Sequence, residues 1–513
     1  MAKKIQIPIL KVNQWLNPWN AVQYDNDKRK ENRKKPLPYF YLFTIKAKDL
    51  KKLSKVRPRL ANEKRELEIG VQRKHDPVRS EEIKRYIKEG YPLSELLKGK
   101  KTAEDYKDLK MPGWLPTAIV ANILKKETIR GQKKIDNKDL VIVDEENSCL
   151  ILPDGVKDNK WNPTVPPIEI IDGQHRLWAF DTEDKVAGEF ELPVVAFYDL
   201  DVTWQAYLFY TINVKPKKIN RSLAYDLYPL LRIQEWLEKA PDTAFVYKET
   251  RAQEIVEVLW SYEGSPFKNR INMLGETQSQ ANITQAAFIR NLIASFIKTI
   301  STKGLGGLFG SKLNDDFNNP LSWNRTQQAA FIVYIWKKMS DAIEKSKLKW
   351  AEDLRNLDEN IQLFNSDYDP AFYSKYSLIS TDQGVRGFMH IINDMVFMNA
   401  AELNIRDIGW KYENEIKEDR IDSEDLYRAI KDLEKSSLNK FISELCSELT
   451  NFDWRTSSEP NLSTEERRAQ MVFKGSSGYK ELRSQLIQLL INSKNKKMSS
   501  VAKNIWGVLG YAG

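Results

Sequence analysis

The sequence predicts an α/β domain followed by a predominantly α-helical region. Two patterns indicate this division. Short runs of β-branched and aromatic residues alternate with helix-like segments from residue 39 to about residue 230, as in a sheet covered by helices. Beyond that point apolar residues recur at helical spacing and strand-like runs become rare. Of 513 residues, 41% are hydrophobic and 11% are aromatic, which is enough for a large core and excludes wholesale disorder.

The α/β part is expected to consist of short elements. Strand-like runs occupy residues 39–45, 67–71, 117–124, 168–171 and 192–198. A hairpin is predicted where residues 140–144 and 149–152 flank a turn-like Glu-Glu-Asn-Ser sequence. Helix-like segments occupy residues 48–56, 79–88 and 176–180. In the second helix Ile83 and Ile87 share one face and Ser80 is available near the start.

The helical part shows several apolar stripes. One stripe begins at Ile289, a second begins at Phe388 after the turn-like residues 381–384, and a third begins at Leu482 in the expected last helix. We therefore expect four parts along the chain: a basic segment of residues 1–65, an α/β domain of residues 66–230, a helical domain of residues 231–440 and a C-terminal helical segment of residues 441–513.

Other features of the helical part predict structural roles. The glycine-rich residues 304–310 follow a helix and not a strand, so they predict a mobile loop or a helix terminator and not a dinucleotide site. Residues 474–478 precede a helix and could form an anion nest, but they lack the Gly-Lys-Ser/Thr ending of a P-loop, and we favour a loop. Tyr334 and Trp336 are expected in the core, and His390 is expected to be structural.

The net positive charge of the chain lies at its N-terminal end. Residues 1–75 contain 20 Lys and Arg against 7 Asp and Glu, whereas the whole chain carries +9. Basic residues concentrate at Lys28, Arg29, Lys30, Arg33, Lys34 and Lys35. With Trp15, Trp19 and Tyr24 nearby, this segment predicts either DNA binding through phosphate charges and base stacking, or a solvated surface.

Several protein classes are excluded by composition. Cys149 and Cys446 are the only cysteines, too few for a disulfide framework or a thiolate zinc site. No apolar run approaches the roughly 18–20 residues that span a bilayer, and the N-terminus lacks the features of a signal peptide. We therefore expect a cytoplasmic protein with no membrane partner.

The segment that indicates chemistry runs from a strand through a glycine into a helix at Asp172-Gly173-Gln174-His175-Arg176. Glycine permits a tight turn and close approach of a ligand, and a helix start favours an anion. Arg176 is expected either to bind phosphate or to pair with Asp172. His175 is expected to donate to a phosphate, to act as a general base, or to cap the helix. Asp172 suits a metal ion that accompanies a nucleotide.

The five residues 172–176 resemble the signature of the DGQHR-domain family, which is similar to the ParB/sulfiredoxin nucleotide-binding fold and includes DndB-type and DpdB-type proteins of bacterial DNA-modification clusters. Gln72-Arg73 resembles a Gln-Arg pair of related domains, and residues 209–213 with the basic Arg221 downstream resemble the family's third block. The chain departs from sulfiredoxins, which have a reactive cysteine where Gln174 stands, and from the Glu-Arg-Arg turn of ParB proteins.

The resemblance implies ATP and Mg²⁺ as cofactors and an ATPase of a DNA-modification or phage-defence system, either 7-deazaguanine insertion or phosphorothioation. It implies cofactor contacts from Gln72, Arg73, Gly173, Arg176, Asn213 and Arg221, with Asp172 and Asn213 on the metal. Catalysis is assigned to Asp172, Gln174, His175 and Arg176, where His175 or Gln174 positions water. The alternatives are a DNA-binding regulator with nucleotide at most as an effector, and a scaffold that recruits another protein of the system.

Overall fold

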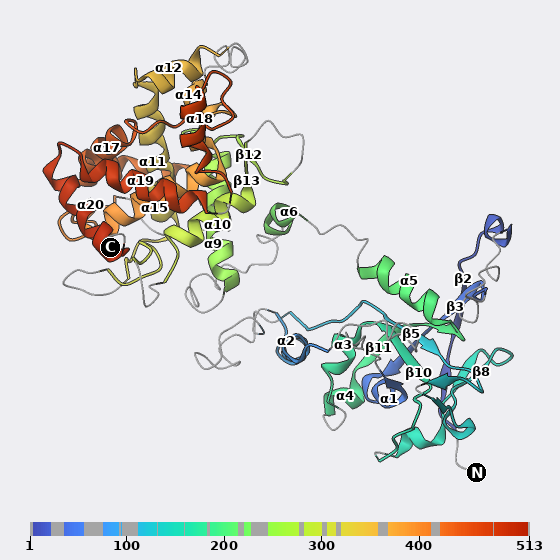
Figure 1. The fold of residues 1–513 in the computed structure, drawn as a ribbon. Helices are drawn as coiled ribbons and strands as arrows, with labels where there is room; N and C mark the ends of the chain where they lie inside the picture. Colours follow the sequence, from blue (N-terminus) through green and yellow to red (C-terminus); the bar gives the residue numbers. More distant parts are fainter. Residues whose placement is uncertain are drawn as a thin grey trace. The chain divides into compact units, whose positions relative to one another are not determined.

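A computed structural model shows the expected fold class, with a mixed α/β region followed by a mostly helical one (Figure 1). The chain divides into two compact units, Met1–Lys218 and Ile219–Gly513. The structure describes residues 4–21, 35–55, 75–91, 94, 111–130, 132–158, 160–181, 185–213, 220–226, 245–275, 282–299, 305–313, 320–357, 368–411, 421–475 and 477–510. The expected strand at residues 67–71 lies outside these ranges.

The first unit is built on a mixed six-stranded sheet of order β2-β3-β11-β5-β10-β4. Its strands are β2 (Leu10–Asn13), β3 (Tyr39–Lys46), β4 (Ser54–Lys55), β5 (Ile119–Ile123), β10 (Ile168–Asp172) and β11 (Glu191–Tyr198). β5 pairs in parallel with β11 and antiparallel with β10, and β10 pairs in parallel with β4. Alternate residues of the central strands, such as Val194 and Ala196, are fully buried, so the sheet carries the core of this unit.

Two smaller sheets complete the strands of the first unit. β1 (Gln6–Pro8), β9 (Cys149–Ile151) and β8 (Ile142–Asp144) form a three-stranded sheet, and β6 (Ile129–Arg130) pairs with β7 (Lys133–Lys134). The predicted hairpin is confirmed, because β8 and β9 pair antiparallel. The strands β1 and β2 were not predicted within the basic segment. Each has only three or four residues and Pro8 interrupts the run, so no strand pattern stands out there.

The helices of the first unit are α1 (Ala47–Leu53), α2 (Pro77–Glu89), α3 (Gln174–Trp178), α4 (Lys185–Glu189) and α5 (Val202–Asn213). The predicted start of α2 at Arg79 was two residues late. Asp76 caps this helix by accepting from the backbone N–H groups of Val78 and Arg79, and Pro77 occupies the first turn, where its missing N–H costs nothing. Ser80, which we expected near the helix start, is buried instead of capping the helix.

The second unit is helical. Its helices are α6 (Arg221–Asp226), α9 (Phe245–Ser261), α10 (Gln285–Ser295), α11 (Arg325–Glu344), α12 (Lys349–Arg355), α14 (Pro370–Tyr373), α15 (Asp382–Met398), α16 (Ser423–Lys435), α17 (Leu438–Leu449), α18 (Thr464–Met471), α19 (Gly478–Ile491) and α20 (Lys496–Val508). A short parallel pair joins β12 (Ile271–Asn272) to β13 (Ile283–Thr284). Tyr334 and Trp336 of α11 are fully buried, which confirms that they belong to the core.

Two expectations for this unit were wrong. Residues 381–384 are not a turn, because Thr381 caps α15 and accepts from the Gly384 N–H at 3.1 Å. The helix that contains Leu482 is followed by α20 and is not the last. The described part of the glycine-rich residues 304–310 is a loop, as expected, and it is packed against the helices. Leu308 is fully buried and its N–H donates to Asn393 Oδ1 at 2.9 Å. Close packing against a neighbouring backbone explains its glycines better than mobility does.

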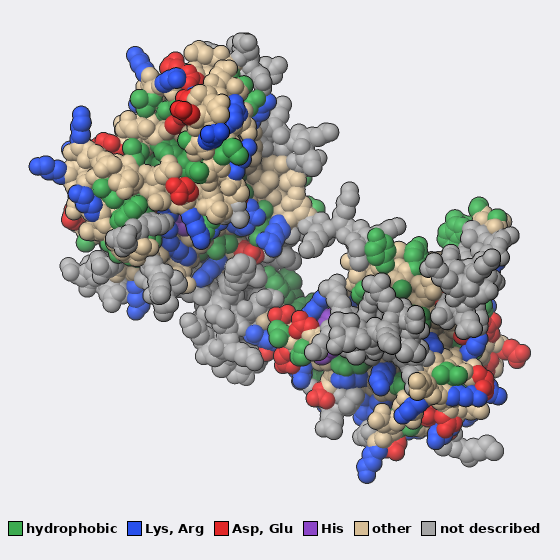
Figure 2. Space-filling view, in the orientation of Figure 1, with side chains coloured by type: hydrophobic (Ala, Val, Ile, Leu, Met, Phe, Trp, Pro, Cys, Tyr) green, Lys and Arg blue, Asp and Glu red, His purple; other side chains and the backbone are tan. Residues whose placement is uncertain are grey.

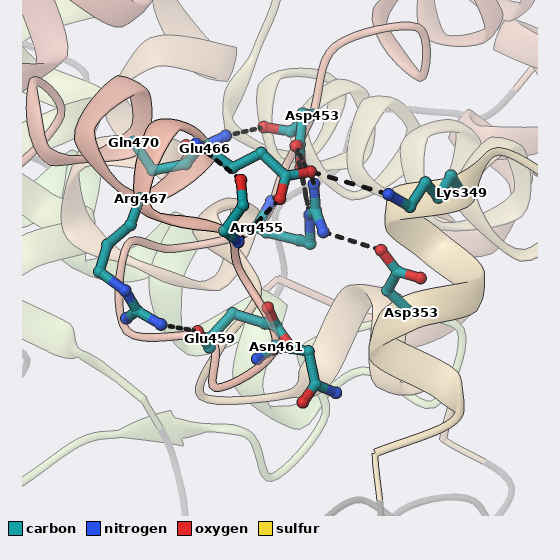
Figure 3. Close-up of polar contacts among 10 residues, drawn as sticks. Lys349, Asp353, Asp453, Arg455, Glu459, Asn461, Glu466, Arg467 and Gln470 are labelled. Carbon is teal, nitrogen blue, oxygen red and sulfur yellow. Dashed lines mark hydrogen bonds and ion pairs between the residues drawn. The ribbon is translucent and has the colours of Figure 1, made fainter.

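A buried arginine joins α12 to α18 in the second unit (Figure 3). Arg455 is 4% exposed and donates to Asp453, to Asp353 of α12 at 2.7 Å and to Glu466 of α18 at 3.0 Å. Bonds from Ser463, followed by the bond from Arg455, lower the pKa of Glu466 from its ordinary 4.5 to about 2. Glu466 therefore stays charged at neutral pH, and all three carboxylates share Arg455 as their cation.

Within the described residues, no helix has both the length and the apolar character needed to cross a bilayer. Both cysteines are buried and unbridged.

We predict that Arg455→Met lowers the free energy of unfolding of the helical unit by about 2–3 kcal/mol, because three carboxylates lose their shared cation. The loss is expected to be smaller than for a fully buried pair, since these carboxylates are 28–35% exposed. Scanning calorimetry measures the change. Lys349→Ala is the control, because Lys349 is 80% exposed and 3.8 Å from Glu466, and it should alter stability by less than about 0.5 kcal/mol. Equal losses in both variants would contradict this role of Arg455.

Candidate functional site

A pocket of about 410 Å³ lies in the first unit, where β10 passes through Gly173 into α3. This volume falls within the roughly 300–1,000 Å³ that is typical of small-molecule sites. The pocket is lined by Arg79 and Ile83 of α2, Leu115 and Thr117 ahead of β5, the five residues Asp172, Gly173, Gln174, His175 and Arg176, and Phe209 and Asn213 of α5. The structure therefore brings the signature residues together with Asn213, as the sequence predicted for a nucleotide site.

Gly173 makes the turn between strand and helix. Its φ of +93° lies in the left-handed region, where residues with a Cβ are strained. A Cβ at this position would also lie 2.6 Å from Cδ1 of Ile119 and 2.9 Å from Nη2 of Arg176. Glycine is therefore required both by the backbone conformation and by the close approach of its neighbours.

One carboxylate joins three elements of the site. Asp172 at the end of β10 accepts from Arg176 of α3 at 2.9 Å through Oδ2 and from Asn213 of α5 at 3.2 Å through Oδ1. Arg176 also donates to the backbone carbonyls of Thr117 at 2.8 Å and Ala118 at 3.3 Å. The expected pairing of Arg176 with Asp172 is thus present. The bonds from Arg176 to Asp172, Thr117 and Ala118 use three of its five guanidinium N–H groups.

His175 is held on the other side of the pocket. Its ring stacks on that of His75, with centroids 5.5 Å apart, and Ser80 Oγ donates to the His175 carbonyl at 3.2 Å. Burial, followed by the positive charge of Arg79, lowers the pKa of His175 below its ordinary 6.5, so the imidazole is neutral at pH 7. Gln174 is 6% exposed, and its amide nitrogen lies 3.4 Å from His175 Nε2.

Arg79 is a pocket residue that the sequence analysis missed. It is exposed, and in the described part of the chain its guanidinium makes no hydrogen bond or ion pair. Its charge lowers the pKa of Arg176, after burial, as well as that of His175. The positive charge of Arg79 therefore has no anionic partner among the residues that the structure describes. The Asp76-Pro77 helix start indicates that Arg79 lies in the first turn of α2, but it carries no signal that this helix packs against the pocket.

Comparison with known proteins identifies the family of this chain. A family model described as DndB, DNA-sulfur modification-associated, matches residues 38–492. The chain belongs to the DndB family. This membership points to a DNA-sulfur modification cluster and, of the two modification systems left open by the sequence, favours the one that uses sulfur. Searches of curated proteins and of solved structures gave no match.

Some predicted residues of this DndB-family chain are not part of the described pocket. Gln72 and Arg73 lie outside the described residues, as do Tyr24 and the basic residues Lys28, Arg29, Lys30, Arg33 and Lys34. Arg221 is exposed and begins α6 in the second unit. Lys35 is described and lies 5.4 Å from the ring centroid of Trp15. On the face that Figure 2 shows, Lys and Arg are interspersed with Asp and Glu on both units.

Asp172 and Asn213 fit the expected Mg²⁺ by their chemistry. Mg²⁺ is bound in proteins by one or two carboxylates together with substrate phosphates and waters. Asn213 turns its amide nitrogen toward Asp172, and rotation of that amide would present its oxygen to the same point. Among the described residues, no three His, Cys, Asp or Glu side chains are placed to hold a metal ion. A metal here would therefore need ligands from a bound phosphate or from water.

We predict that Gly173→Ala lowers the free energy of unfolding of the first unit by about 2 kcal/mol, because the added Cβ is strained at positive φ and meets Ile119 and Arg176. Thermal unfolding measures the change. Gly188→Ala in α4 is the matched control, since no atom lies within 4 Å of its Cβ position, and it should be neutral or stabilising by up to about 1 kcal/mol. If Gly173→Ala unfolds at the wild-type temperature, the turn does not require glycine.

Proposed function

We propose that this DndB-family protein binds ATP with Mg²⁺ in the pocket at the β10–α3 turn and hydrolyses it as a component of a DNA-sulfur modification system. The family membership supports a role in DNA-sulfur modification, and the pocket supports the binding of a nucleotide. The pocket is large enough for a small-molecule ligand and is lined by a glycine turn that lets a ligand approach the backbone closely.

The uncompensated charge of Arg79 is the observation on which this proposal chiefly depends. Arg176 is neutralised by Asp172, whereas Arg79 faces the pocket without an anionic partner among the described residues. Counted over the described residues that line it, the pocket has an excess of one positive charge, which favours an anionic ligand. A triphosphate would accept from Arg79 and from the two N–H groups that Arg176 still has available.

A bound Mg²⁺ would account for the presence of the Asp172 carboxylate in a pocket that otherwise favours anions. Asp172 would repel a phosphate unless a cation lay between them. Bound Mg²⁺ would neutralise charge on the phosphates, and Asp172 and Asn213 would hold it. In this arrangement Arg176 fixes the orientation of the Asp172 carboxylate through the 2.9 Å bond.

Hydrolysis needs a positioned water, and His175 is the proposed base. A neutral imidazole can accept a proton, and the pKa of His175 is lowered, which keeps the ring neutral at pH 7. Its Nδ1 is shielded from solvent and has no hydrogen-bond partner among the described residues. Gln174 beside it is the other candidate for orienting the water.

A DNA-binding regulator is the second candidate function. The 20 Lys and Arg against 7 Asp and Glu in residues 1–75 favour it, because such an excess attracts DNA phosphates. In that case nucleotide would be an effector and would not be hydrolysed. Measuring phosphate release by the purified protein, with Arg79→Ala as the comparison, distinguishes the two functions.

We predict that Arg79→Ala abolishes stabilisation by ATP with Mg²⁺ while leaving the unliganded protein unchanged to within about 0.5 kcal/mol, because Arg79 is exposed and makes no side-chain bond within the described residues. At a 100-fold excess over the dissociation constant, ATP should stabilise the wild type by about 2.7 kcal/mol. Thermal unfolding with and without nucleotide measures both values.

The control for this experiment is Arg85→Ala on the same helix. Arg85 pairs with Glu89 at 2.8 Å and does not line the pocket, so this variant should keep the full response to ATP. Equal stabilisation of Arg79→Ala and wild type by ATP would place the nucleotide elsewhere.

We predict that any affinity for duplex DNA depends chiefly on the N-terminal basic residues. Replacing Lys28, Arg29, Lys30, Arg33, Lys34 and Lys35 by Gln should flatten the plot of log affinity against log salt by several units, since each phosphate contact contributes about −0.9. Fluorescence anisotropy at several salt concentrations measures the slope. The control replaces the exposed Lys494, Lys496 and Lys497 by Gln, which should leave the salt-dependence slope unchanged. An unaltered slope in the six-residue variant would identify the N-terminal segment as solvated surface.

A further inference from the structure

The helical unit contains a second group of basic side chains, far along the chain from the β10–α3 pocket. Arg386 and His390 lie one turn apart on α15, Arg483 lies on α19, and Lys298 follows α10. We call these four residues the α15–α19 basic cluster. Asp394, one further turn along α15, is fully buried and pairs with Arg483.

Neighbouring contacts fix the positions of the cluster residues. The Arg386 guanidinium stacks over the Tyr479 ring at 3.5 Å, and the His390 ring lies parallel to the same ring with centroids 6.2 Å apart. The Lys298 carbonyl accepts from the Gly307 N–H at 3.1 Å, so the glycine-rich loop holds its backbone. Arg386 and His390 of α15 therefore meet Tyr479 of α19, and Lys298 and Arg483 lie close enough to His390 for their charges to act on it.

Three of the four basic side chains contain nitrogens that make no hydrogen bond to any described residue. His390 is 5% exposed, and neither of its ring nitrogens has a partner in the described part of the chain. Arg386 Nε is likewise shielded from solvent and unpaired there. No described residue bonds or pairs with the Lys298 ammonium. Buried N–H groups are normally hydrogen-bonded, so these nitrogens indicate a missing acceptor.

The charges of the cluster do not balance either. Lys298, Arg386 and Arg483 bring three positive charges, and Asp394 supplies one negative charge. Burial, followed by the charges of Arg483, Lys298 and Arg386, lowers the pKa of His390 well below 6.5, so the imidazole is neutral. Two positive charges thus remain uncompensated by the described residues in a largely buried site, which is costly without a counter-ion.

We propose that the α15–α19 basic cluster binds a small phosphate-type oxyanion, with Arg386, His390 and Lys298 as donors to its oxygens. A tetrahedral dianion supplies the missing acceptors and balances the two excess charges at once. Burial favours a small ligand over the backbone of a duplex, because His390 is 5% exposed and Arg483 is 13% exposed. This site is separate in sequence from the proposed ATP pocket and does not depend on that proposal.

Inorganic phosphate is the probe for this site. Isothermal titration of the full chain with phosphate at constant ionic strength should give binding that falls at least tenfold in Arg386→Gln and in His390→Phe. His390→Phe keeps a ring against Tyr479 and removes only the nitrogens, so its unliganded melting temperature should not fall. Lys298→Gln is a further variant at a less buried position. Arg428 of α16 is exposed, so Arg428→Gln is the matched control and should bind as the wild type does.

Two comparisons assign the phosphate to this cluster. Arg79→Ala should retain the binding, because Arg79 belongs to the other unit. The chain has three histidines, so nuclear magnetic resonance of labelled imidazoles can follow His390 alone, and phosphate should raise its pKa. The proposal is overturned if phosphate fails to bind, if His390→Phe and Arg386→Gln bind it as the wild type does, or if Arg79→Ala alone removes the binding.

Discussion

The bond between Arg176 and Asp172 is the interaction on which the architecture of the pocket depends. Asp172 ends β10, Arg176 lies on α3 one turn later, and the pair closes the glycine turn at 2.9 Å. Arg176 extends to the carbonyls of Thr117 and Ala118 ahead of β5, while Asp172 receives Asn213 from α5. Two side chains thus join the β10–α3 turn to two segments that are distant from it in sequence. The pair is 17–21% exposed, so water screens it only in part.

A second carboxylate on the same strand explains why α5 lies where Asn213 can reach the pocket. Glu169 is 8% exposed and accepts from Arg130 Nε at 2.7 Å and from Gln205 of α5 at 3.0 Å. Asn122 of β5 donates to the Glu169 carboxylate at 3.3 Å. The amide oxygen of Asn122 accepts from the Leu200 N–H. A buried carboxylate with all these donors is compensated and rigid. β10 therefore carries one carboxylate that anchors structure and one that faces the pocket, which is the arrangement expected of a preorganised site.

Part of the local geometry of this site could be predicted from the sequence. Gly173 could be recognised because a strand that passes directly into a helix needs a residue that tolerates positive φ. Pairing with Asp172 was one of the two alternatives that the sequence offered for Arg176, and the structure shows this pair. Arg79 and Thr117 could not be placed, because they reach the pocket only through the packing of α2 and the segment ahead of β5. The strands β1 and β2 could not be predicted either, because their formation also depends on distant parts of the chain. Their pairing partners β9 and β3 lie elsewhere in the chain, and three or four residues hold too little pattern to predict a strand alone.

The central claim is that the pocket at the β10–α3 turn receives a nucleoside triphosphate. Photolabelling of the full chain with an azido-ATP, followed by mass spectrometry of its peptides, tests this claim most directly because it reports position as well as binding. We expect Mg²⁺-dependent labelling, suppressed by excess ATP, in peptides that contain Ile83, Leu115 or Phe209, which line the pocket beside its charged residues. Labelling that ATP suppresses only in peptides of the helical unit would contradict the account.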